Sequence, residues 1–78
     1  MIKIRQDISI GSNLRALRKK SGLTQKLVAT KMQLLGCDIN RSVYSRYEIG
    51  GLNIRVSDLI ALRKIFDCRY DDFFDGLN

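Results

Sequence analysis

Hydrophobic residues recur at helical spacing along most of the chain, and short segments of polar residues and glycine separate these stretches. On a helical wheel, with about 100° per residue, each stretch places its apolar side chains on one face. The pattern predicts helices over approximately 10–21, 24–35, 41–49 and 56–66, and a last helical turn at 70–74. No strand competes with these helices. The sequence therefore predicts an all-α fold, a compact bundle of four to five short helices.

Residue types that favour helix ends stand at the predicted boundaries. A Ser, Thr or Asn oxygen can accept a hydrogen bond from one of the free N–H groups of a first helical turn. The candidate N-caps are Ser9, Thr24 and Asn40. Glycine is common directly after a helix, and it stands there at Gly22, Gly36 and Gly50. These signals predict short helices joined by tight connections.

The apolar face of each predicted helix gives the expected core. Its members are Ile10, Leu14, Leu17, Val28, Ala29, Met32, Leu35, Tyr44, Tyr47, Leu59, Leu62, Phe66 and Phe73. Leu27 and Leu34 lie off the apolar stripe of the second helix, and periodicity alone does not explain them. A chain of 78 residues is long enough for one modest core and no second lobe.

The first nine residues differ from the rest. Ile2, Ile4 and Ile8 alternate with polar residues, a period-two pattern that indicates an extended arm or an edge strand. A frayed terminus explains the same residues at least as well. We therefore expect an N-terminal arm over 1–9 and a single domain over 10–78.

Composition disfavours several classes of function. The chain contains no His, so the usual general base and the commonest metal ligand are missing. Its two cysteines, Cys37 and Cys68, form no CxxC pair, and no two carboxylates have the spacing of an acid–base pair. We expect no enzyme, no metal, no cofactor and no small-molecule substrate. No apolar run is long enough to span a membrane, and reduced cysteines indicate the cytoplasm.

Positive charge is concentrated in the first part of the chain. The net charge is +6; residues 1–31 contain eight basic residues and one acidic residue, whereas residues 56–78 contain three and five. A basic N-terminal part favours a polyanionic partner, such as nucleic acid, on one side of the molecule. Charge alone does not decide this, because many small soluble domains are basic.

The third predicted helix carries hydrogen-bonding side chains that suit such a partner. Tyr44 and Tyr47 face the core on the wheel. The outward face carries Arg41, Ser42, Ser45 and Arg46. Arg can bind O6 and N7 of guanine together, Ser can bond to several bases, and a helix fits the major groove. A solvated surface helix would show the same residue types, so this helix alone does not establish base contact.

The preceding helix strengthens the case for DNA. A helix, a short turn and a second helix with a polar outer face form a helix-turn-helix unit, whose first helix lays its N-terminus against a phosphate. Thr24 and Gln25 occupy that N-terminus. Arg18 and Glu48 stand at matching borders of the apolar stripes of the first and third helices. We expect them to form a semi-buried ion pair that fixes the angle of the third helix.

At these positions the sequence resembles a known family. The segments that carry the resemblance to the lambda-repressor-like (Xre-type) helix-turn-helix family are Asn13–Arg18, Gly22–Gln25, Val28–Met32 and Ser45–Gly50. The resemblance covers residues 10–74 and implies an all-helical, sequence-specific DNA-binding domain that usually acts as a dimer. It places Arg41, Ser42 and Arg46 on bases, Thr24 and Gln25 on phosphate, Arg18 with Glu48 in a structural pair, and Ser45 on either base or phosphate.

The sequence departs from that family in two places. The segment Gln33–Asp38 is longer than the usual tight turn, so we expect the second helix to extend by one turn. Ile49 stands where the family often has a phosphate-contacting Asn. Asn40 and Arg55 are further candidates for phosphate contacts.

The acidic, aromatic C-terminal segment is a candidate for self-association. We expect Phe73 to close the core and Phe74 and Leu77 to lie at a dimer interface. A twofold dimer would place two recognition helices about 34 Å apart and read a near-palindrome through the major groove. We therefore predict a homodimeric, sequence-specific regulator of transcription that binds double-stranded DNA and is cytoplasmic and nucleoid-associated. The alternative is the DNA-binding antitoxin, or another protein-interaction module, of a toxin pair.

Overall fold

Four α-helices and one 3₁₀ helix make up the fold. The computed structural model describes residues 9–77, so of the predicted arm only Ser9 is described. The elements are α1 (Gly11–Lys20), α2 (Gln25–Leu34), α3 (Arg41–Ile49), α4 (Val56–Phe66) and η1 (Tyr70–Phe74). Within the described residues there is no strand, which confirms the predicted all-α class. No helix among them is long and apolar enough to cross a membrane.

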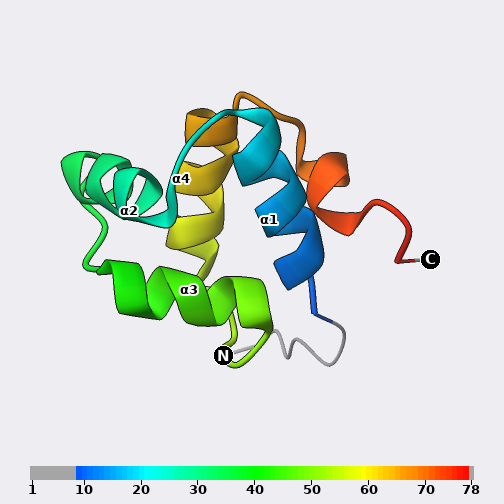
Figure 1. The fold of residues 1–78 in the computed structure, drawn as a ribbon, viewed down its shortest axis with the longest axis horizontal. Helices are drawn as coiled ribbons and strands as arrows, with labels where there is room; N and C mark the ends of the chain where they lie inside the picture. Colours follow the sequence, from blue (N-terminus) through cyan, green and yellow to red (C-terminus); the bar gives the residue numbers. More distant parts are fainter. Residues whose placement is uncertain (1–8, 78) are drawn as a thin grey trace.

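The helices enclose one core. In Figure 1, α3 lies across one end of α1 and α4, while α2 and η1 lie on opposite sides of the molecule. The buried core residues are Ile10, Leu14, Val28, Met32, Ile39, Tyr44, Tyr47, Leu62, Phe66 and Phe73. Packing joins α1 to α3 and η1, and joins α2 to α3 and α4. Each helix is too short to be stable alone, so this shared burial holds the bundle together.

The predicted N-caps act at two helices and are displaced at the third. The Thr24 hydroxyl oxygen accepts from Leu27 N at 3.1 Å, and Asn40 Oδ1 accepts from Val43 N at 2.9 Å. At α1 the N-cap is Ile10 rather than Ser9. The Ser9 hydroxyl still accepts from Gly11 N at 3.0 Å, so it satisfies a free N–H from one residue further out.

The long connection between α2 and α3 is tightly held. Gly36 adopts a left-handed conformation, with φ of 90°, and stops α2 as predicted. Gln33 Nε2 donates to the carbonyl oxygen of Ile39 at 2.7 Å, and the Ile39 side chain is buried in the core. This connection is therefore an ordered part of the domain that fixes the start of α3.

Leu35 is the clearest error in the predicted core. Its side chain is 51% exposed, because α2 ends at Leu34 and Leu35 belongs to the turn beyond it. Leu34 is 81% exposed. Both leucines therefore contribute to the surface at the free end of α2.

A close approach of two backbones sets the contact between α1 and α3. Gly11, the first residue of α1, lies against the last turn of α3. A Cβ at this position would lie 2.7 Å from the carbonyl oxygen of Tyr47 and would overlap that of Glu48. Only glycine fits this contact without a shift, so the residue fixes the distance between the two helices.

Candidate nucleic-acid interface

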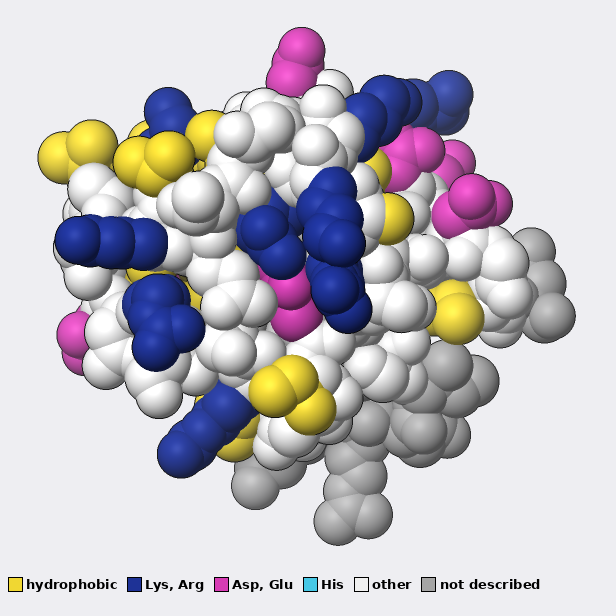
Figure 2. Space-filling view, viewed as in Figure 1, with side chains coloured by type: hydrophobic (Ala, Val, Ile, Leu, Met, Phe, Trp, Pro, Cys, Tyr) yellow, Lys and Arg dark blue, Asp and Glu magenta, His cyan; other side chains and the backbone are white. Residues whose placement is uncertain are grey.

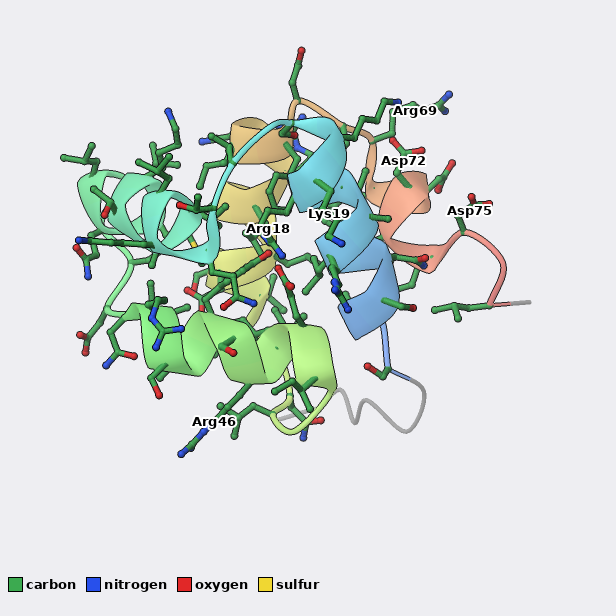
Figure 3. The ribbon with its side chains drawn as sticks, viewed as in Figure 1. Arg18, Lys19, Arg46, Arg69, Asp72 and Asp75 are labelled. Atoms are coloured by element: carbon green, nitrogen blue, oxygen red, sulfur yellow. The ribbon has the colours of Figure 1, made fainter. Side chains whose placement is uncertain are left out.

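The outer face of α3 is polar, and its inner face is aromatic. Tyr44 and Tyr47 are buried, at 0% and 2% exposure. Arg41, Ser42 and Arg46 are exposed, and Ser45 is partly exposed. Figure 3 shows Arg46 pointing away from the body of the molecule. The two tyrosines thus hold the helix from behind, while its arginines are free to reach a ligand.

Glu48 connects α3 to both preceding helices. Its Oε2 accepts from Arg18 Nε at 2.7 Å, and its Oε1 accepts from Arg18 Nη2 at 3.2 Å. Gln25 Nε2 donates to the same Oε1 at 3.1 Å. The Arg18 and Glu48 side chains are only 14% and 4% exposed. The expected ion pair is therefore present as a bidentate contact in a partly buried site. The two parallel hydrogen bonds fix the relative orientation of the two side chains.

The surroundings of Glu48 keep it charged. Burial by itself would raise the pKa of this carboxyl group, but the hydrogen bonds from Arg18 and Gln25 outweigh burial and lower the pKa below its ordinary value. Burial and the neighbouring Glu48 raise the pKa of Tyr44. At neutral pH the site holds a carboxylate, a guanidinium and a neutral phenol.

A second polar contact holds the same C-terminal turn of α3 and was not predicted. The Tyr47 hydroxyl donates to Asp58 Oδ2 at 2.6 Å, and Asp58 is 1% exposed in the first turn of α4. Arg55 Nε approaches the same oxygen at 3.3 Å. The sequence offered one signal, an acidic residue in a first helical turn, but it did not identify the tyrosine 11 positions earlier as the partner.

Arg55 makes two hydrogen bonds within the fold. Besides its contact with Asp58, its Nη2 donates to the carbonyl oxygen of Asp38 at 2.8 Å, which ties the start of α4 to the α2–α3 connection. These contacts use two of the five guanidinium N–H groups, and the side chain is 56% exposed. Arg55 thus has a role within the fold, and its phosphate contact stays a prediction.

The N-terminus of α2 keeps donors free for an anion. The Thr24 oxygen accepts the cap bond, so the hydroxyl proton remains available. The first N–H groups of α2 have no partner within the helix, and the helix dipole makes this end electropositive. Asn40 offers the same arrangement at the start of α3, since Oδ1 makes the cap bond and the amide N–H groups stay free.

Basic side chains surround these elements on one face. Figure 2 shows Lys and Arg spread over α1, α2 and α3, whereas a group of acidic side chains lies at the right edge, over η1. Lys19 of α1 lies on the same face as Arg18 (Figure 3). This distribution agrees with the charge asymmetry along the sequence and gives the face a positive field that attracts a polyanion.

The polar outer face of α3, the free donors at the start of α2 and the basic surroundings together form a nucleic-acid-binding geometry. A family model described as helix-turn-helix matches residues 14–73. The chain belongs to this helix-turn-helix family. The match confirms the resemblance to lambda-repressor-like domains and identifies the protein as a DNA-binding helix-turn-helix regulator. Searches of the curated proteins and of the solved structures gave no match.

The helix-turn-helix domain leaves the two residues predicted for self-association in different surroundings. Phe74 is 49% exposed on η1. Leu77 is partly buried and packs against the core. A contact with a second copy is therefore open to Phe74, and Leu77 contributes chiefly to the domain itself.

Proposed function

We propose that this regulator recognises a specific sequence in double-stranded DNA and thereby controls transcription in the cytoplasm. In this proposal α3 enters the major groove, Arg41, Ser42 and Arg46 contact bases, and Ser45 contacts a base or phosphate. Thr24, Gln25, Asn40 and Arg55 contact the phosphate backbone. The observation that carries the proposal is the combination on α3 of exposed arginines with two buried tyrosines.

The regulator is further proposed to act as a homodimer. Two half-sites double the number of base pairs that one short helix can select, which a domain of this size needs for specificity. Two copies related by a twofold axis would read a near-palindrome, whereas two copies in the same orientation would read a direct repeat. The bound DNA therefore reports both the number of copies and their symmetry.

Selection of bound sequences from a random DNA pool tests the proposal. The expected result is one enriched motif that contains two half-sites. Repeating the selection with the Arg46→Ala variant should broaden the motif at one position per half-site while the other positions remain. A protein that enriches no sequence, or a motif that Arg46→Ala leaves unchanged, would contradict α3 as the reading element.

The antitoxin alternative depends on a protein partner for the acidic C-terminal segment. Asp71 is exposed there, with a side chain 90% accessible, which would suit a basic partner as well as a second copy. No other feature of the described residues favours a toxin. Recovery of a stoichiometric basic protein with the chain expressed in its own host would favour this alternative.

A further inference from the structure

An apolar surface lies between the C-terminal ends of α2 and α4. We define the α2–α4 patch as Leu34, Leu35, Ile60 and Ile65, with Lys31 and Lys64 at its rim. Leu34, Leu35 and Ile60 are 81%, 51% and 39% exposed. A shallow pocket is lined by Leu34, Leu35, Ile65 and both lysines, and a neighbouring pocket shares Leu35, Ile60 and Lys64. The patch is therefore continuous, and it accounts for Leu34, which the core stripe of α2 left unexplained.

The rim of this patch is positively charged and unpaired. Lys31 and Lys64 are exposed, and neither forms an ion pair with any residue in 9–77. The patch lies away from the reading face: Figure 2 shows hydrophobic side chains gathered over the free end of α2, while Arg46 points in another direction in Figure 3. An occupant of the patch would thus be apolar with acidic flanks, and it would leave α3 free.

The η1 segment of the same chain has that chemistry. We define the η1 face as Asp71, Phe74 and Asp75. Residues three apart lie on one side of a 3₁₀ helix, so Asp71 and Phe74 share a side. Phe74 is 49% exposed. Asp71 has only an ion pair of 3.8 Å with Arg69 among the described residues, and both of these side chains are more than 80% exposed. Such a surface pair is weak and easily exchanged.

We propose that the η1 face of one copy of this chain docks on the α2–α4 patch of the next. Phe74 covers Leu34 and Leu35, and the aspartates meet Lys31 and Lys64. The two surfaces lie on opposite sides of the molecule (Figure 1), so one chain cannot pair them internally. The contact is head-to-tail, so a pair of copies retains one free surface of each kind, the α2–α4 patch of one copy and the η1 face of the other.

Charge favours this arrangement over a twofold contact through η1. A twofold axis at Phe74 would bring the aspartates of two copies together, and like charges across an interface are unfavourable. A twofold contact of the α2–α4 patch with itself would bring lysines together in the same way. The head-to-tail contact pairs opposite charges on both sides of the apolar centre. A head-to-tail contact has no twofold axis between the copies, so the inference predicts half-sites that do not form a palindrome if it acts together with the proposed DNA binding.

Two complementary variants test the contact without DNA. Leu34→Ser with Leu35→Ser removes the patch and keeps the η1 face, whereas Phe74→Ser removes the η1 face and keeps the patch. In sedimentation velocity over a concentration series, each variant alone should associate at least about tenfold more weakly than the wild type. An equimolar mixture should form a one-to-one pair, because one variant supplies the intact η1 face and the other supplies the intact patch.

The possible outcomes separate the arrangements. A twofold contact through Phe74 would leave the Leu34→Ser, Leu35→Ser variant fully associated and would give no additional species on mixing, and this result would overturn the proposal. A wild-type chain that stays monomeric at millimolar concentration would also overturn it. Ile49→Ser removes an isoleucine that is 78% exposed on α3 and serves as the matched control, with unchanged association expected. Circular dichroism checks that all variants remain folded.

Charge reversal provides an independent test of the same contact. Lys31→Glu with Lys64→Glu makes the patch acidic, and Asp71→Lys with Asp75→Lys makes the η1 face basic. Each variant alone should be monomeric, and the mixture should associate, although both proteins keep a net positive charge. Loss of DNA binding by these variants is not the readout, so failure of this inference leaves the DNA-reading role of α3 untouched.

Discussion

Arg18 and Glu48 join the first and third helices through two hydrogen bonds, of 2.7 and 3.2 Å, in a site where both side chains are nearly buried. Replacing one partner leaves the other charge in a poorly hydrated site. We expect Arg18→Met to lower the free energy of unfolding by about 3–5 kcal/mol. Urea denaturation measures the loss. The double variant Arg18→Met with Glu48→Leu should recover much of it, because no buried charge then remains unpaired.

The same pair predicts a pH dependence. The folded state lowers the pKa of Glu48 below its ordinary value of 4.5, so the carboxylate stabilises the protein fully above that pH. This contribution is lost as the pH falls through the lowered folded-state pKa. The difference in unfolding free energy between the wild type and Glu48→Gln should therefore be constant from pH 6 to 8 and shrink below about pH 4. A difference that grew in acid would contradict the assignment.

Gly11→Ala tests the close approach of α1 and α3. The added methyl group would meet the carbonyl oxygens of Tyr47 and Glu48, so the helices must move apart. We expect a loss of about 1–3 kcal/mol, typical of overpacking, measured by thermal unfolding. Ser12→Ala, on the exposed side of the same helical turn, is the matched control and should change stability by less than about 0.5 kcal/mol.

Arg46→Ala should reduce discrimination between DNA sequences. We expect a loss of roughly 1–3 kcal/mol for the preferred site and a smaller loss for random DNA, because the arginine is proposed to contact a base. Competition binding at a fixed salt concentration measures both affinities. Arg69→Ala removes another exposed arginine, next to η1 and far from α3 in Figure 3, and should leave discrimination unchanged. Equal losses on both DNAs would assign Arg46 to phosphate instead.

Asn40 combines a helix cap with a proposed phosphate contact, and two substitutions separate these roles. Asp and Ser cap helices about as well as Asn, so Asn40→Asp and Asn40→Ser should both keep the stability of α3. Asp lacks a donor and repels phosphate, whereas Ser retains a hydroxyl donor. Asn40→Asp should therefore weaken binding to specific and random DNA alike and reduce the salt dependence by about one ion, while Asn40→Ser should weaken binding less and leave the salt dependence unchanged. Equal affinities for the two variants would remove Asn40 from the interface.

Local signals predicted the helices well. Thr24 and Asn40 cap α2 and α3 as expected, and Gly36 and Gly50 end them, because capping depends on residues close together in the chain. The inward direction of Tyr44 and Tyr47 also followed from the helical period. The Arg18–Glu48 contact could be predicted since both residues border apolar stripes that must meet.

Contacts set by the packing of distant segments could not be predicted in this way. The hydrogen bond from Tyr47 to Asp58 requires the relative position of α3 and α4, which no local pattern contains. The contacts of Arg55 with Asp58 and with the Asp38 carbonyl depend on the same packing, and its phosphate contact stays a prediction. Leu35 looked like a core residue because periodicity does not reveal that α2 ends at Leu34.

The Glu48 carboxylate accepts hydrogen bonds from α2, the helix before the turn, and from α1. The N-terminal end of α2 and the proposed reading helix α3 therefore cannot shift independently, since Glu48 of α3 accepts hydrogen bonds from Gln25 and Arg18 at once. The surface is therefore preorganised before a duplex arrives, and little conformational entropy is lost on binding. The association rate should accordingly be governed by diffusion and ionic strength, with no slow rearrangement step.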